Sequence, residues 1–356
     1  PYCPDVLVVG SGYGGAVAAL RFAEHGQSVA LLERGNEYLA GEFPSDLSQT
    51  GGFIRAELNA SGGANAVGNE DALFDFRLGQ RASALVGNGL GGGSLINAAV
   101  ALRPDPRVFA HSPWPEAIRQ ADLDEDFQRA GAGLQVQTPA TQAASSTCVP
   151  QRTAKYQRLQ QIGRAAASAS ASPLLSVSCE DVPLAIEFSD QPSQAQGPRA
   201  ACVGCGNCVS GCNHQAKLSL DKTYLAEALG TGLVRIQPLT EVTSVTQAPD
   251  GRYVVTTKQI DVLGNVLANK VISCDRLFLA GGSMGSTQLL VKARETGTLP
   301  KLNEHIGTRW SSNGEIFMVR NVYTPTGSKA SVLPVTGIDA YDHRDQQVYA
   351  MNIAIP

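Results

Sequence analysis

A run of closely spaced glycines between two apolar segments constrains the fold of this chain more than any other feature. The first segment, residues 5–10, reads DVLVVG, and the turn after it contains Gly10, Gly12, Gly14 and Gly15, which include the spacing G-x-G-x-x-G. A helix-like segment of small and apolar residues follows at 16–25, and a second apolar segment at 28–32 ends at Glu33. A strand, a tight turn, a helix and a second strand in this order predict a βαβ unit within a Rossmann-like α/β domain.

The residue types in this unit predict a bound dinucleotide. Gly10 permits the tight turn, Gly12 lets the main chain approach a pyrophosphate, and Gly15 lets the helix pack closely on the strand. Phosphate is favoured at a helix N-terminus, where N–H groups are unpaired and the dipole is positive. Glu33, about 20 residues further on, can accept a hydrogen bond from a ribose hydroxyl. A glycine-rich turn without a ligand is the alternative, and the motif alone does not separate FAD from NAD.

A second glycine cluster lies at residues 87–97, which read GNGLGGGSLIN. Four glycines in the five positions from Gly89 to Gly93 are more than a turn requires. We expect the main chain here to pass close to a flat or bulky group, with a flexible loop as the alternative.

Residues 202–212 read CVGCGNCVSGC, and their cysteines have the spacing of a bacterial ferredoxin run: Cys202, Cys205, Cys208 and Cys212. The run departs from that pattern because Asn213 replaces proline and because it occurs once. We predict an iron–sulfur cluster, [4Fe–4S] or, with one thiolate unused, [3Fe–4S]. A zinc site, a pair of disulfides and thiols that only pack are the alternatives. His214 is a less expected ligand, because cysteine normally supplies the ligands.

Composition excludes some functions. The net charge of −4, the pI of about 5.8 and the lack of a basic run argue against a nucleic-acid partner. No stretch approaches the roughly 18 apolar residues that cross a bilayer, and no charged-then-apolar leader opens the chain. The chain starts at Pro1 rather than Met, so removal of a preceding segment is one interpretation. Cysteine usage does not assign a compartment.

Three sequence blocks resemble, in the same order, the FAD-binding blocks of the glucose-methanol-choline (GMC) oxidoreductases, and are most similar to the cholesterol oxidase branch. The blocks are residues 11–35, 86–109 and 277–317. Weaker similarity extends to the end of the chain, while residues 120–199 are not matched. The resemblance implies FAD as the cofactor and an alcohol as the substrate.

The resemblance also implies which residues bind FAD. By position they are Gly10, Gly12, Gly14, Gly15, Glu33 and Arg34 for the ADP half, Gly91, Gly92, Ser94 and Asn97 for the flavin and its phosphate arm, Val242 for the adenine side, Ala280, Gly281 and Ser286 from a later strand and helix, and Asn313 and Gly314 near the flavin.

The domain organisation follows from the matched blocks. We expect a discontinuous FAD-binding domain from 1–119 and 216–315, and an insertion at 120–215 that carries the cysteines. A flexible linker is the alternative for the Ala-, Ser- and Gln-rich part of the insertion. Residues 316–356 would begin a substrate-binding domain that we expect to be incomplete. Apolar alternation over 252–282 predicts a hairpin that turns at Gly264 and Asn265, followed by the last strand of the FAD-binding sheet.

The catalytic residues are not identified within the chain. Family members carry a catalytic histidine with a second histidine or asparagine in a C-terminal block, and the resemblance places that block beyond Pro356 or on a second subunit. In cholesterol oxidases a catalytic carboxylate lies in a stretch that here aligns near Met351 and Asn352. Neither side chain can act as a general base, so steroid oxidation is not implied.

The favoured function is a dehydrogenase in which FAD takes a hydride from an alcohol. Electrons would leave through the cluster to an acceptor protein such as a cytochrome. Two alternatives stay open. One is an oxidase that uses oxygen, with structural or zinc-binding cysteines, and the other is a non-catalytic electron-transfer subunit.

Overall fold

The computed structural model describes residues 3–46, 48–60, 63–110, 113–119, 121–138, 161–166, 168, 174–189, 191–194, 197–312, 314, 336–342 and 347–351. Its contacts divide the chain into two units. The first unit contains residues 1–96 and 219–320, and the second contains residues 97–218 and 321–356. Each unit is described by itself, and the domain boundaries expected from the sequence stay a prediction.

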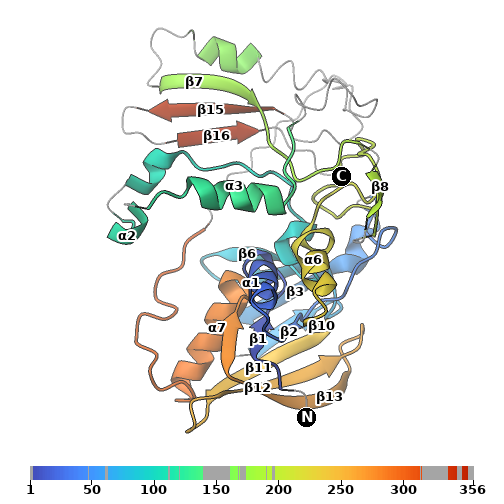
Figure 1. The fold of residues 1–356 in the computed structure, drawn as a ribbon, viewed down its shortest axis with the longest axis vertical. Coiled ribbons are helices and arrows are strands. Elements are labelled where there is room, and N and C mark those ends of the chain that lie inside the picture. The colour runs from blue at the N-terminus through green and yellow to red at the C-terminus, as the bar shows by residue number, and fades with distance from the viewer. Residues whose placement is uncertain are drawn as a thin grey trace. The chain divides into compact units, whose positions relative to one another are not determined.

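A four-stranded parallel sheet forms the centre of the first unit (Figure 1). Its order is β10-β2-β1-β14, with bounds Val234–Gln237, Val29–Leu32, Val6–Val9 and Arg276–Leu279. All residues of β1 and β2 are buried, as expected for parallel strands covered on both faces. The strands come from distant parts of the chain, since Val6 pairs with both Val29 and Arg276.

Helix α1 (Tyr13–Glu24) follows β1 directly and packs on this sheet. Its buried side is made of small residues and one leucine: Gly15, Ala16, Ala18, Ala19, Leu20 and Ala23. The helix ends before Gly26, whose φ of 76° and N–H bond to the Ala23 carbonyl are typical of a helix C-terminus. The βαβ unit predicted from the sequence is therefore confirmed, although α1 begins three residues before the predicted segment.

An antiparallel sheet packs on the parallel sheet through apolar side chains. It contains β11 (Thr240–Gln247), β12 (Tyr253–Ile260) and β13 (Val266–Cys274). The shared core is Leu7, Val9, Ala30, Leu32, Val242, Val245, Val255 and Cys274. The turn between β12 and β13 contains Gly264 with φ 84°, which agrees with the predicted hairpin. Helices α6 (Tyr224–Gly230) and α7 (Gly282–Glu295) complete this part.

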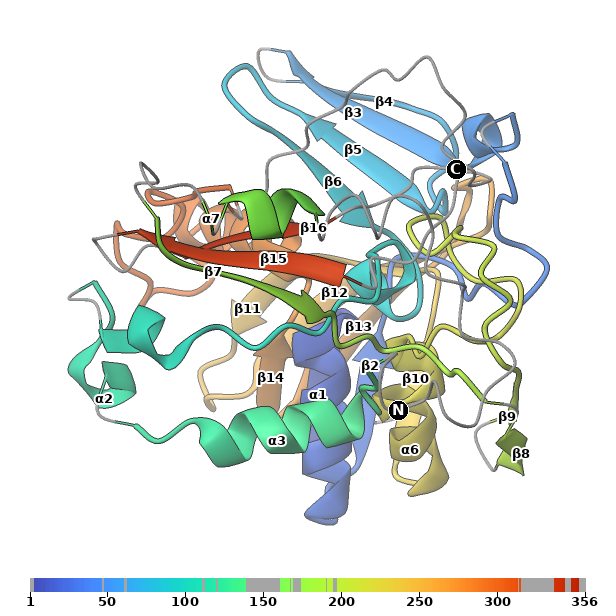
Figure 2. The same cartoon turned by 90° about the horizontal axis from the view of Figure 1, so that it is seen from above.

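The remaining sheet of the first unit has the order β4-β3-β5-β6 (Figure 2). The bounds of β3 to β6 are Ile54–Ala60, Gly63–Val67, Phe74–Leu78 and Ser83–Gly87. Short 3₁₀ turns lie at Thr50–Phe53, Gly92–Leu95 and Leu220–Lys222. The buried Arg55, Glu57 and Asp75 form ion pairs with one another and with Arg77.

In the second unit an antiparallel sheet has the order β16-β15-β7, with bounds Gln347–Met351, Thr336–Asp342 and Leu174–Asp181 (Figure 2). Other elements are the turn Pro106–Ala110, helices α2 (Glu116–Arg119) and α3 (Asp124–Gly133), and strands β8 (Gln191–Gln194) and β9 (Gly197–Arg199). A core around Leu184, Ile186, Phe188 and Leu218 supports the cysteine run.

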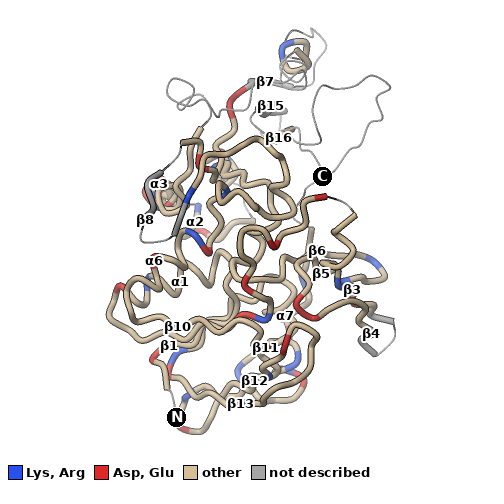
Figure 3. Tube along the Cα trace, turned by 90° about the vertical axis from the view of Figure 1, so that its right-hand side faces the viewer, with Lys and Arg blue, Asp and Glu red and all other residues tan. Residues whose placement is uncertain are grey.

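Acidic and basic residues are interspersed along the described trace rather than gathered in a basic stripe (Figure 3). Among the described residues, none of the helices combines the length and apolar character needed to span a bilayer.

Candidate cofactor site and cysteine cavity

The first glycine turn combines two tight contacts with one open position. A Cβ atom at Gly10 would lie 2.3 Å from the Ala280 carbonyl oxygen, and one at Gly15 would lie 1.9 Å from the Gly10 carbonyl oxygen. A Cβ at Gly12 would meet no heavy atom within 4 Å. Gly10 and Gly15 are therefore required for packing, whereas Gly12 leaves space beside the N-terminus of α1.

Glu33 is held in place by main-chain and side-chain donors. Its Oε2 accepts hydrogen bonds from Ser11 N (3.0 Å) and Ser11 Oγ (2.6 Å), and its Oε1 accepts one from Gly35 N (2.9 Å). A carboxylate has about four lone-pair positions, so Oε1 retains capacity for one further donor. The arrangement fits the predicted hydrogen bond to a ribose hydroxyl.

The second glycine cluster packs directly on the first. A Cβ at Gly92 would lie 2.9 Å from Gly12 Cα, and Gly91 adopts φ 111°. Gly91 N donates to Ser11 Oγ at 2.9 Å, so a single hydroxyl connects Glu33 with the second glycine cluster. The flexible-loop interpretation is therefore wrong for this segment, which is tightly packed.

Ser94 and Arg34 make protein contacts in this structure. Ser94 Oγ donates to the Gly91 carbonyl at 2.7 Å and accepts from Leu220 N at 3.0 Å. The Arg34 guanidinium forms an ion pair with the fully buried Asp75. Their predicted contacts with FAD stay predictions.

The other predicted FAD residues fall in several places. Ala280 and Gly281 lie between β14 and α7, with Ala280 N donating to Val9 O at 2.7 Å, and Ser286 lies in the first half of α7. Val242 lies on β11 and packs in the apolar core between the parallel and antiparallel sheets. Gly314 has φ 81°, Asn313 lies outside the described residues, and Asn97 belongs to the second unit.

A buried ion network surrounds Asp75. Burial raises the pKa of Asp75, but Arg34, Arg77 and Arg55 lower it more strongly, so the carboxyl titrates below its ordinary range. Arg55 Nη1 lies 2.9 Å from Asp75 Oδ1, and Arg77 Nη2 lies 2.7 Å from Asp75 Oδ2. The network fixes Arg34, the residue after Glu33, to the β3–β6 sheet.

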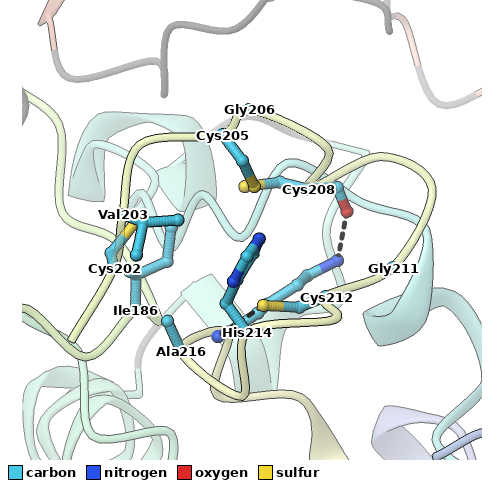
Figure 4. A pocket seen from close by; sticks show the side chains of 11 residues that line it. Ile186, Cys202, Val203, Cys205, Gly206, Cys208, Gly211, Cys212, His214 and Ala216 are labelled. Carbon is cyan, nitrogen blue, oxygen red and sulfur yellow. Dashed lines mark hydrogen bonds between the residues drawn. The ribbon is translucent and has the colours of Figure 1, made fainter. Parts of the chain in front are cut away.

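The four cysteines of the run line one cavity in the second unit, together with His214 and Lys217 (Figure 4). The cavity is small and partly open to solvent, and its volume of about 10 Å³ is close to the smallest that holds one water molecule. Positive φ angles at Gly204, Gly206 and Gly211 curl the loop around it. We call residues 202–212 the cysteine loop.

The four cysteines of this loop are not joined in disulfides, and two of their sulfur atoms lie near main-chain N–H groups. Gly204 N lies 3.4 Å from Cys202 Sγ, and Lys217 N lies 3.4 Å from Cys212 Sγ. Burial raises the pKa of Cys202 to about 12. Burial also raises the pKa of Cys208 to about 11, against the opposing effect of Lys217. A bound metal would have to displace these protons, because thiolates are the ligands.

Among the described residues, which include the whole cysteine loop, no three His, Cys, Asp or Glu side chains are grouped to hold a metal ion. A zinc site needs its four ligands about 2.0–2.3 Å from one point. Neither the zinc alternative nor the predicted cluster is thus confirmed.

Sequence reasoning missed Ser11 and Lys217. Ser11 is the polar side chain between the first two glycines of the motif, a position that could have suggested a hydrogen-bonding role. Lys217 lies five residues after Cys212, and nothing local signals its long-range contacts.

Comparison with known proteins supports the assignment of the fold. The family model described as GMC oxidoreductase matches residues 5–308. A cholesterol oxidase of Acinetobacter baumannii is 26% identical over 320 residues, covering 88% of this chain and 55% of that protein. A cholesterol oxidase of Mycobacterium tuberculosis is 28% identical over 327 residues, covering 87% and 51%. The chain thus spans about half the length of these relatives.

More distant similarities point to other alcohol oxidases. The long-chain-alcohol oxidase FAO4B of Arabidopsis thaliana is 27% identical over 238 residues, covering 65% of this chain and 25% of that protein. A solved fungal aryl-alcohol oxidase has a TM-score of 0.47 and 15% identity, covering 81% of this chain and 47% of that chain. These names do not assign a metal cluster to the cysteine loop.

The family match covers most of the chain and includes both glycine clusters, β1, α1 and β14. It confirms the predicted Rossmann-like FAD-binding fold and supports FAD as the dinucleotide. The chain belongs to the GMC oxidoreductase family.

Proposed function

We propose that this chain is the FAD-binding part of an enzyme that oxidises the hydroxyl group of an alcohol-type substrate. The observation that carries the proposal is the contact between the two glycine clusters, where Gly92 meets Gly12 and Ser11 bonds to both Glu33 and Gly91. Such close main-chain packing beside an open helix N-terminus suits a dinucleotide.

The chain's own residues would bind and orient the cofactor. Glu33 Oε1 would accept a hydrogen bond from a ribose hydroxyl. The pyrophosphate would occupy the open space beside Gly12 and accept hydrogen bonds from the first N–H groups of α1. Gly91 and Gly92 would lie beneath the flavin arm, as the family resemblance implies. When bound, FAD supplies a two-electron acceptor for hydride.

The alcohol class rests on the family and on the names of the relatives. One relative is named cholesterol oxidase and another long-chain-alcohol oxidase, and both names describe substrates with a hydroxyl group. Oxidation converts such a hydroxyl to a carbonyl with loss of one hydride and one proton. The chain spans about half of the matched cholesterol oxidases, and we assign the proton acceptor to no residue of the described structure.

The acceptor of the electrons defines the finer proposal, which is a dehydrogenase whose electrons leave through an iron–sulfur cluster in the cysteine loop. It is favoured by the ferredoxin-type spacing of the four cysteines that line one cavity and by the two N–H groups near sulfur atoms. The competing proposal is an oxidase that passes electrons to oxygen, favoured by the names of the relatives.

One experiment separates these proposals. The purified enzyme that contains this chain, with any segment or subunit that completes its active site, is loaded with FAD and, anaerobically, with ferrous iron and sulfide, and is then mixed with primary alcohols of graded length or with a sterol. Bleaching of the flavin bands by an alcohol supports the proposed function, and a folded chain that takes up no FAD contradicts it. Reduction of a one-electron acceptor without peroxide supports the dehydrogenase, whereas peroxide formation in proportion to oxygen consumed supports the oxidase.

A further inference from the structure

Lys217 joins two segments that lie far apart in the sequence. Its Nζ donates to the Asn97 carbonyl at 2.6 Å and to the Cys208 carbonyl at 2.7 Å. Its own main-chain N–H points to Cys212 Sγ at 3.4 Å. One residue therefore contacts the cysteine loop at two points and Asn97, the last residue of the second glycine cluster, at a third.

The side chain of Lys217 is enclosed rather than solvated. The residue is 3% exposed, and its neighbours Ala216 and Leu218 belong to the apolar core that also contains Cys202 and Ala99. Enclosing an ammonium group costs free energy unless hydrogen bonds compensate. Carbonyl oxygens from two separate segments supply such bonds here, so both segments are held by the same group.

The two segments have additional local hydrogen bonds that depend on their conformation. Ala99 N donates to Asn97 Oδ1 at 3.0 Å, and Ser210 N donates to the Asn207 carbonyl at 2.9 Å. We call residues 97–99 the Asn97 bend. The hydrogen-exchange rate of the Ala99 amide reports whether the Asn97 bend keeps its conformation, and that of the Ser210 amide reports the same for the cysteine loop.

Lys217 also places positive charge in the wall of the cysteine cavity. It lines that cavity with all four cysteines, and its ammonium group donates to the Cys208 carbonyl at 2.7 Å. Thiolates around an iron–sulfur cluster carry net negative charge, and nearby charge is one determinant of the cluster's potential.

The geometry points to Lys217 as a positioning residue that ties the cysteine loop to the Asn97 bend and keeps positive charge beside the four thiols. The tie stands on hydrogen bonds alone. The role of the charge rests on the proposed function, because it requires a cluster in the loop.

The test uses four variants of the full chain. Lys217→Met keeps the apolar stem and removes the charge and the donors, and Lys217→Gln keeps donors but removes the charge. Lys217→Arg keeps both, and Lys301→Met removes a lysine charge at an exposed position. If Lys217→Met does not fold, Lys217→Gln carries both comparisons, because it removes the charged donor from the tie.

Hydrogen exchange measured by mass spectrometry tests the tie without any cofactor. In Lys217→Met, peptides that contain Ala99 and Ser210 should exchange about tenfold faster or more, because a hydrogen bond from a charged group contributes about 1.5–3 kcal/mol. Lys217→Arg should remain near the wild type, and Lys301→Met should not change. Unchanged exchange in both peptides of Lys217→Met, or marked acceleration in Lys301→Met alone, overturns the tie.

The potential of the reconstituted cluster tests the charge. After anaerobic incubation with ferrous iron and sulfide, Lys217→Met and Lys217→Gln should have a more negative midpoint potential than the wild type, and Lys217→Arg should restore it. Equal potentials in the wild type and Lys217→Gln overturn the charge role. A wild type that takes up no iron and sulfide overturns the cluster proposal and the charge role, while the exchange result still decides the tie.

Discussion

Replacing Ser11 with alanine removes the hydroxyl that connects the two glycine clusters. The hydroxyl is fully buried, donates to Glu33 Oε2 at 2.6 Å and accepts from Gly91 N at 2.9 Å. A hydrogen bond to a charged group contributes about 1.5–3 kcal/mol. Because both bonds exist in the chain without a cofactor, we expect this loss mainly as lower stability of the cofactor-free chain.

A smaller effect should reach FAD affinity. Without Ser11 Oγ, Glu33 keeps only its main-chain donors Ser11 N and Gly35 N, and holding the looser side chain when FAD binds should cost about 0.5–1.5 kcal/mol. The dissociation constant of FAD should therefore rise about two- to tenfold. The assay is a fluorescence titration of the cofactor-free chain with FAD, accompanied by thermal unfolding.

Ser28→Ala is a matched control. Ser28 Oγ donates to Asp5 Oδ2 at 2.7 Å, and Ser28 N donates to the same oxygen at 2.8 Å, which repeats the Ser11–Glu33 arrangement at the opposite end of β1 and β2. Ser28→Ala should leave FAD affinity unchanged. The reasoning is refuted if Ser11→Ala binds FAD as the wild type does, or if both variants weaken binding equally.

Three further predictions follow from the same geometry. Gly12→Ala should keep the stability of the cofactor-free chain within about 0.5 kcal/mol, because the added Cβ meets nothing within 4 Å. The same Cβ would occupy the predicted phosphate space, so FAD binding should weaken more than about tenfold. Equal losses of stability and affinity would count against this prediction. Asp75→Asn should lower the free energy of unfolding by about 3–5 kcal/mol at neutral pH. Because the pKa of Asp75 is lowered, this difference in stability from the wild type should persist above about pH 4 and shrink as the pH falls through the lowered pKa. Urea unfolding from pH 2 to 7 measures the difference, and one that grows in acid would contradict the prediction. Cys205→Ser should lower the iron bound after anaerobic reconstitution, whereas Cys274→Ser, outside the loop, should not; equal iron in both variants would argue against the cluster.

The sequence was sufficient for local features of the fold. Alternating and continuous apolar runs predicted the first βαβ unit and the hairpin at Gly264, because both depend on neighbouring residues. The sequence predicted a late strand in this sheet but not its neighbour. The pairing of β14 with β1 depends on contacts between residues as distant as 6 and 276. Strand β10 beside β2 was not predicted, since its four residues have no distinct pattern.

The β3–β6 sheet was missed for a physical reason. Arg55 and Glu57 on β3, and Asp75 and Arg77 on β5, alternate along their strands and form an enclosed ion network. Residues 54–58 (IRAEL) and 74–78 (FDFRL) alternate apolar and charged side chains, a pattern from which a strand with its apolar face buried is predicted, whereas here the charged Arg55, Glu57 and Asp75 are buried. Ion pairs satisfy the buried charges, and their partners are not identifiable from local sequence.

The candidate site was predicted in part. Glycine spacing and Glu33 indicated a dinucleotide, but the hydroxyl of Ser11 that links the two glycine clusters depends on residues 11, 33 and 91 meeting in space. Likewise, the cysteine spacing marked the loop, whereas the bond from Lys217 to Asn97 spans 120 residues. Such long-range hydrogen bonds leave no periodic signal in the sequence.

Titration of the folded, cofactor-free chain with FAD tests the central claim most directly. The two glycine clusters predict saturable binding of one FAD per chain, with a change in flavin fluorescence that Gly12→Ala weakens and Ser28→Ala does not. A folded chain that binds no FAD, or that binds it equally well with alanine at position 12, would contradict the claim that these clusters form the cofactor site.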